Sequence, residues 1–207
     1  MGGWGIVGEK APEAPCKVSS LRQGPFPWEQ VLIEQGAATL AGLKTASLFC
    51  VPVESGWKEK VRLWNDSFSQ KGIFLLPLRC QENRALLYLC RVSQLQADLN
   101  RPGVLRFLAR YGYDSTQAQE AVFRLRARFQ ESEEFPHEIG VFLGYPLGDV
   151  VGFIRHGGKR CKCAGCWKVY CNEREAQKKF AQIRKCREVY GRLWAQGRTV
   201  WQLTVAA

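Results

Sequence analysis

The sequence predicts an α+β fold, a single domain in which helices pack against a mainly antiparallel sheet of roughly four to six strands. The chain has 207 residues, of which 46% are hydrophobic, enough to bury the core of one sizeable domain. Apolar segments of strand length alternate with segments whose apolar residues recur every three or four positions. Two of the strand segments flank a short polar turn, which is typical of an antiparallel hairpin.

Residues 1–27 are rich in Gly, Pro and small polar residues and show no periodicity, so they are expected to form a poorly ordered extension. Residues 28–207 then form the single domain. No apolar run reaches the length of a membrane span, and the opening residues lack the apolar core of a signal peptide. We therefore expect a cytoplasmic protein without a membrane partner.

The first half of the domain is predicted to supply two helices and three strands. A helical pattern weakened by two glycines precedes the apolar segment TASLFCVPV, and a polar helical pattern follows it. GIFLLPLRC and ENRALLYLCR then read as the hairpin. In chain order these elements occupy residues 28–43, 45–53, 57–70, 72–80 and 82–91.

The middle of the chain is predicted to be mostly helical. A short helix over 94–100 is followed by one over 104–111, which Gly112 ends. Ser115 is the expected N-cap of a helix running to about residue 133. The next apolar run, IGVFL at 139–143, is apolar on both faces and is predicted to be a central strand. A short helix over 147–154 follows.

The C-terminal part is predicted to be a short strand over 166–170 and a long helix. Asn172 is the expected N-cap of this helix, with Glu175 completing a capping box. Its apolar stripe consists of Ala176, Phe180, Ile183, Tyr190 and Leu193.

Positive charge is concentrated near the C-terminus. Residues 155–198 contain thirteen Lys or Arg and three Glu, a net charge of +10 out of +11 for the whole chain. Lys178, Lys185 and Arg192 lie seven residues apart on the side opposite the apolar stripe, and we call them the basic ridge. Such a ridge suits docking of an acidic protein or nucleic acid. The alternative is a solvated helix face.

Four blocks of the sequence resemble the bacterial family catalogued as domain of unknown function 3793. They are TLAGLKTASLF at 39–49, ENRALLYLCR at 82–91, FPHEIGVFLGYPLGDVVGFI at 135–154 and CAGCWKVY at 163–170. The resemblance covers about residues 29–207. It implies a compact bacterial cytosolic domain and names no reaction.

His137 and Glu138, at the start of the expected strand over 139–143, are candidate catalytic residues. Histidine titrates near neutral pH, and burial can raise a glutamate pKa toward neutrality, so either side chain can serve as a general base. In a regular strand the two side chains point to opposite faces. The alternative is structural: His137 caps the strand, and Glu138 pairs with Arg84 or a lysine.

Three further residues are candidates for holding an anionic ligand or cofactor. Lys44 lies in the AGLKTA turn, and we group it with the catalytic candidates. Arg84 lies in the hairpin turn, and Tyr145 lies in a Gly-Tyr-Pro turn that leads into a helix, whose free amides can bind an anion. Asp149 in the first turn of that helix is expected to be structural.

The chain has nine cysteines. Four of them, Cys161, Cys163, Cys166 and Cys171, are close enough in sequence to bind zinc or an iron-sulfur cluster. The alternative is that these cysteines are buried thiols without a ligand. Cys186 is expected to be a core residue of this kind.

These candidates favour a protein that handles a small anionic molecule or a metal or redox cofactor, with His137, Glu138 and Lys44 at the pocket. Whether it is an enzyme stays open. The alternative is a non-catalytic module that docks an acidic protein or nucleic acid through the basic ridge.

Overall fold

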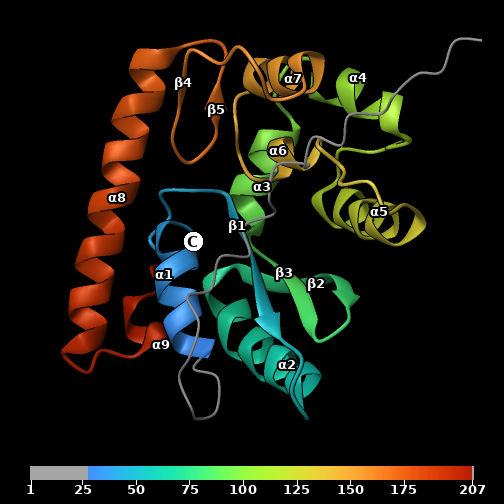
Figure 1. The fold of residues 1–207 in the computed structure, drawn as a ribbon. Helices are drawn as coiled ribbons and strands as arrows, with labels where there is room; N and C mark the ends of the chain where they lie inside the picture. Colours follow the sequence, from blue (N-terminus) through green and yellow to red (C-terminus); the bar gives the residue numbers. More distant parts are fainter. Residues whose placement is uncertain (1–27, 207) are drawn as a thin grey trace, which may run out of the picture.

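A three-stranded antiparallel sheet lies at the centre of the computed structural model, which describes residues 28–206 (Figure 1). Its strands are β1 (Ala46–Pro52), β2 (Ile73–Gln81) and β3 (Arg84–Arg91), in the order β1-β3-β2. The predicted hairpin is confirmed as β2 and β3. The predicted extension over 1–27 lies outside the described residues.

The central strand β3 separates two hydrophobic clusters. Leu86, Tyr88 and Cys90 pack into one cluster, whereas Leu87 and Leu89 pack into the other. This alternation follows from the two-residue period of a strand. The sheet is therefore covered on both faces, which explains why β3 is almost entirely apolar.

The helices divide between these two clusters. The cluster around Leu87 is completed by α1 (Trp28–Leu40), α2 (Trp57–Phe68) and α9 (Val200–Leu203). The cluster around Tyr88 is completed by α3 (Val92–Leu99), α4 (Val104–Leu108), α5 (Ala118–Glu131), α6 (Ile139–Phe142) and α7 (Leu147–His156). Two 3₁₀ turns, η1 (Ser69–Lys71) and η2 (Ala109–Tyr111), end α2 and α4. The α+β class is thus confirmed.

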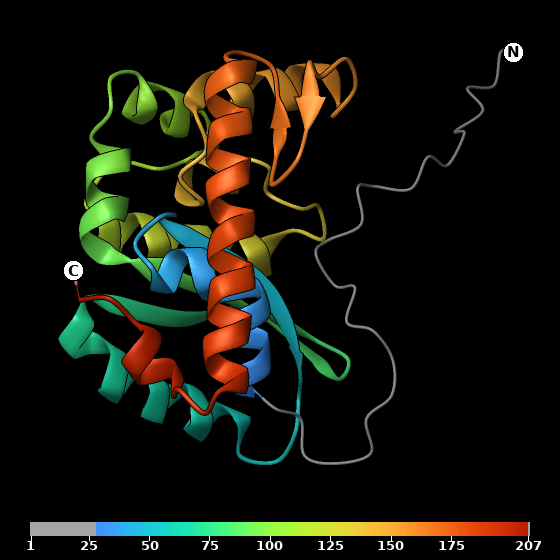
Figure 2. The ribbon, with the colours of Figure 1, turned by 90° about the vertical axis from the view of Figure 1, so that its left-hand side faces the viewer.

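The longest helix, α8 (Glu173–Ala195), runs the height of the molecule beside α1 (Figure 2). Asn172 is its N-cap, as predicted, and its side chain accepts a hydrogen bond from the Glu175 amide at 3.3 Å. A small hairpin of β4 (Cys163–Ala164) and β5 (Lys168–Val169) precedes it and lies between α8 and α7 (Figure 1). Within 28–206, no helix is both long and apolar enough to cross a membrane.

The predicted strand over 139–143 is wrong: this segment forms α6, a single helical turn. The amide of Leu143 donates to the Ile139 carbonyl at 2.9 Å, closing the turn, and Gly144 ends it with a φ of 76°. A five-residue apolar run suits a buried helical turn as well as a strand. The strands of the described region accordingly form separate sheets of three and two.

The start of α5 also differs from the prediction. The helix begins at Ala118, and Ser115 instead accepts a hydrogen bond from the Gln117 amide in the preceding turn. The Ala118 amide donates to the Gln96 side chain of α3 at 2.9 Å, so a tertiary contact satisfies the helix start. The predicted apolar face is confirmed, because Ala118, Val122, Leu125 and Phe129 are buried.

Candidate functional site

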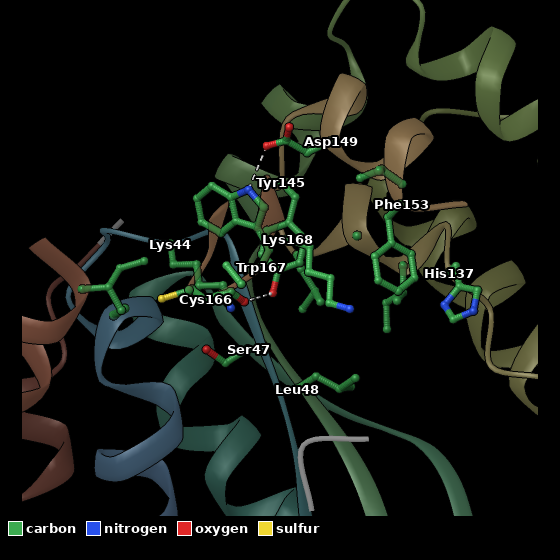
Figure 3. A pocket seen from close by; sticks show the side chains of 18 of the residues that line it. Lys44, Ser47, Leu48, His137, Tyr145, Asp149, Phe153, Cys166, Trp167 and Lys168 are labelled. Atoms are coloured by element: carbon green, nitrogen blue, oxygen red, sulfur yellow. Dashed lines mark hydrogen bonds between the residues drawn. The ribbon is translucent and has the colours of Figure 1, made fainter. Parts of the chain in front are cut away.

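A cavity of about 610 Å³ lies where the end of α1 and the start of β1 meet α6, α7, α8 and the β4–β5 hairpin. Figure 3 shows Lys44, Cys166 and Trp167 on one side of it and His137 with Phe153 on the other. Its polar lining comprises Gln35, Lys44, Ser47, His137, Tyr145, Asp149, Cys166, Trp167, Lys168 and Arg187. We call this space the central cavity.

Lys44 enters the central cavity from the turn between α1 and β1. The amides of Leu43 and Lys44 both donate to the Ala38 carbonyl, and Gly42 adopts a φ of 73°, which reverses the chain at the end of α1. Lys44 Nζ lies 5.3 Å from the centroid of the Tyr145 ring. Burial and, more weakly, the nearby Arg187 guanidinium lower the pKa of Lys44 to about 8, against an opposing contribution from Cys166.

Tyr145 and Trp167 form an aromatic wall of the cavity. Their rings are stacked with centroids 4.9 Å apart, and the Tyr145 hydroxyl donates to the Cys166 carbonyl at 3.3 Å. Phe180 of α8 packs edge-on against Trp167. Burial raises the pKa of Tyr145 far above its usual value, so its hydroxyl stays protonated at neutral pH.

Asp149 fixes the small hairpin to α7. Its buried carboxylate accepts hydrogen bonds from the Trp167 indole and from the amides of Tyr170 and Cys171, each at 2.8 Å. Asp149 lies in the first turn of α7, as expected, and in addition it joins α7 to the segment that contains Trp167, Tyr170 and Cys171. None of these three hydrogen bonds comes from Lys44, Lys168 or Arg187.

Glycines allow the hairpin to approach α7 and α8. A Cβ atom added at Gly148 would collide with the Cys171 thiol, one at Gly152 would lie 2.5 Å from the Tyr170 ring, and one at Gly165 would overlap Phe180. The prediction from sequence missed these residues. Their signal is the spacing of Gly148 and Gly152, four residues apart on one helical face.

Three of the described side chains that line the cavity are cationic: Lys44, Lys168 and Arg187. The Lys168 ammonium donates to the Gly158 carbonyl at 2.7 Å. Among the described residues, the side chains of Lys44 and Arg187 have neither a hydrogen-bond nor an ion-pair partner. The surface of the cavity is therefore electropositive, with apolar and aromatic walls.

Comparison with known families covers nearly all of the described residues. A family model described as a protein of unknown function, DUF3793, matches residues 32–204. The chain belongs to the DUF3793 family. No curated protein and no solved structure matches it. The resemblance seen in the sequence blocks is confirmed, and the matched range of this DUF3793 protein includes every residue that lines the central cavity.

The DUF3793 protein places its catalytic candidates in two locations. His137 lies at the edge of the central cavity, with ring contacts to Phe135 and Phe153, and partial desolvation lowers its pKa. Glu138 is buried away from the cavity. Its carboxylate pairs with Arg128 at 2.8 Å and accepts a hydrogen bond from the Tyr113 hydroxyl at 3.3 Å. The predicted partners of Glu138, Arg84 or a lysine, are thus wrong: Glu138 pairs with Arg128, because α5 packs beside the turn before α6.

The anion-binding candidates also separate. Tyr145 lines the central cavity together with Lys44. Arg84 is exposed at the turn between β2 and β3 and lines none of the pockets described. The β2–β3 turn, which contains Arg84, therefore lies outside the central cavity.

The four candidate cysteines of the DUF3793 protein are not gathered at one point. Cys166 lines the central cavity, whereas Cys171 is exposed beside Lys162, which donates to its carbonyl. Between residues 28 and 206, no group of three or more His, Cys, Asp or Glu side chains is placed to hold a metal ion. Cys161, just before the hairpin, and Cys163, at its start, are half-buried, and Cys186 is buried as predicted.

Proposed function

We propose that this DUF3793 protein binds a small ligand that carries an anionic group and a flat apolar body. The observation that supports this most directly is that Lys44 and Arg187 line one cavity without a carboxylate partner among residues 28–206. The Lys44 ammonium is partly buried, and the Arg187 guanidinium is exposed at the edge of the cavity. A partly buried cation without a counter-ion is costly, and an anionic ligand would offset that cost for Lys44.

The walls of the central cavity favour the apolar part of such a ligand. Tyr145, Trp167 and Phe153 present ring surfaces, and Leu48 and Val150 add aliphatic surface. Flat ligands pack well against aromatic faces. The volume of about 610 Å³ lies within the range of small-molecule sites.

Calorimetry with phenyl phosphate and with benzyl alcohol tests this proposal. Phenyl phosphate should bind, and benzyl alcohol, which lacks the anionic group, should bind at least about tenfold more weakly. Arg187→Gln should weaken phenyl phosphate binding by about tenfold. Arg184→Gln changes a neighbouring exposed arginine of α8 that does not line the cavity, so it should leave the affinity unchanged. Equal loss in both variants would contradict the proposal.

We propose as a second candidate function that the basic ridge docks nucleic acid. Its three side chains are exposed on α8. Lys178 pairs with Glu175 at 3.0 Å and Lys185 lies 3.9 Å from Glu188, but Arg192 has no ion-pair partner within 28–206. Surface ion pairs of this kind are weak. The phosphates of a polyanion would therefore compete readily with Glu175 and Glu188 for the two lysines.

Single-stranded RNA is the probe for the ridge. The triple variant Lys178→Glu, Lys185→Glu, Arg192→Glu should bind it more weakly, with a shallower dependence of affinity on salt, because phosphate contacts release counterions. The control makes the same charge change at exposed sites of α2, α4 and η2: Lys58→Glu, Arg106→Glu, Arg110→Glu. Equal losses would mean that net charge alone, and not the ridge, drives binding.

A further inference from the structure

The amine of Lys44 is free of the contacts that lysines usually make. In the described region, no carboxylate lies within 4.0 Å of Nζ and no acceptor lies within hydrogen-bond distance. The amine instead faces the Tyr145 ring, with Nζ 5.3 Å from the ring centroid. The amine ends inside the central cavity, where Ser47 and Cys166 lie nearby (Figure 3). The amine is thus open to a ligand that enters the cavity.

Lys44 and Arg187 differ in what they offer to that ligand. The guanidinium of Arg187 remains charged at any physiological pH and binds carboxylates or phosphates. An ammonium whose pKa is about 8 is neutral in roughly a tenth of the molecules at neutral pH. A neutral amine has a free electron pair, and lysines desolvated in pockets act as nucleophiles toward carbonyl groups.

We propose that Lys44 forms an imine with a carbonyl compound that also carries a carboxylate or phosphate, such as an oxo acid. The proposal deepens the anion site proposed above and rests on it. The nitrogen electron pair of Lys44 attacks the carbonyl carbon, forming the C–N bond, and the carbonyl π electrons move to oxygen. Both amine hydrogens then leave with that oxygen as water. Arg187 holds the anionic group, and the Tyr145–Trp167 wall lies against the rest of the ligand.

Trapping with glyoxylate and sodium cyanoborohydride tests the imine. Reduction converts the imine to a stable secondary amine, and peptide mapping by mass spectrometry locates it. We expect modification of Lys44 at least about tenfold faster than that of Lys185, an exposed lysine of α8. The trapping rate should rise between pH 7 and pH 9. Modification of Lys44 no faster than Lys185 would overturn the proposal.

Two comparisons isolate the roles of the two cations. Arg187→Gln should slow modification by glyoxylate about tenfold and slow that by acetaldehyde, which lacks an anionic group, much less, through the small rise in the pKa of Lys44 alone. Lys44→Arg should abolish the adduct at this position, because the guanidinium stays protonated and is not a nucleophile. Circular dichroism and a melting curve verify that each variant is folded.

These measurements distinguish failure of the imine from failure of the anion site. If phenyl phosphate binds in an Arg187-dependent way but Lys44 is not trapped, the imine is overturned and the proposed function stands. If Lys44 is trapped equally by both aldehydes with no effect of Arg187→Gln, the oxo-acid assignment is overturned, because the anionic group then plays no part.

Discussion

Lys44 illustrates how a single side chain can lower the stability of the protein that contains it. Its folded-state pKa of about 8 lies below the unfolded value of 10.5, so the unfolded chain binds more protons between these values. The cost is fully present below pH 8 and is relieved as the pH rises toward 10.5. An uncompensated cost of this kind is typical of functional positions.

Lys44→Met should therefore raise the free energy of unfolding at pH 7, by about 1–2 kcal/mol after allowance for the partial exposure of the side chain. This gain should shrink as the pH rises from 8 to 10. Urea denaturation at pH 7 and pH 9.5 measures both effects. Lys185→Met, at an exposed position of α8, should change stability little at either pH. A destabilised Lys44→Met protein at pH 7 would contradict this account.

Glu138 shows the opposite case, a buried charge whose partners are all present. The carboxylate is 1% exposed and joins Arg128 of α5 to the turn before α6. Glu138→Gln leaves the Arg128 charge without its partner and should lower the free energy of unfolding by about 3 kcal/mol, as measured by urea denaturation. Glu134→Gln alters an exposed neighbour and should change it by less than about 0.5 kcal/mol.

At the scale of elements, the site depends on how closely the β4–β5 hairpin packs against α7 and α8. Two residues per strand give the hairpin little stability of its own. Asp149 supplies the hydrogen bonds, and the glycines supply the space. Gly148 and Gly152 lower the intrinsic helix propensity of α7, and their lack of a side chain leaves room for Cys171 and Tyr170.

Two glycine-to-alanine variants test this contact. Gly152→Ala places a methyl group against the base of the Tyr170 side chain and should lower the free energy of unfolding by about 1–3 kcal/mol. Gly191→Ala, in α8, meets no atom within 4 Å and should raise it by about 0.5–1 kcal/mol through helix propensity. Thermal and urea denaturation measure both. Stabilisation by Gly152→Ala would show that the hairpin does not pack closely on α7.

At the scale of the whole molecule, buried Arg91 joins the sheet, α1 and the C-terminal segment. Its guanidinium donates to the carbonyls of Thr39, Leu40 and Val205, each at 2.6 Å. Burial lowers the pKa of Arg91, but the carbonyls at the end of α1 favour a cation there. Lys71 donates to the carbonyls of Trp201 and Thr204. The C-terminal segment is thereby fastened to the start of the fold.

Arg91→Met should lower the free energy of unfolding by more than about 3 kcal/mol, because three carbonyls lose their donor. Amide exchange at Val205, which donates to the Leu40 carbonyl, should also become faster. Arg84→Met is the matched control, since Arg84 is the exposed arginine at the other end of β3, and it should leave both measurements unchanged. Similar losses in both variants would contradict the role given to Arg91.

The sequence by itself determined the α+β class, the β2–β3 hairpin, the apolar faces of α5 and α8, the Asn172 cap and the family. These features depend on local periodicity and on residues close together in the chain. Only the tertiary structure decided that Ile139–Phe142 is helical, that Glu138 pairs with Arg128, and that Lys44 and Arg187 line one cavity. The reason is physical: buried contacts join segments far apart in the chain, and no local pattern specifies which segments meet.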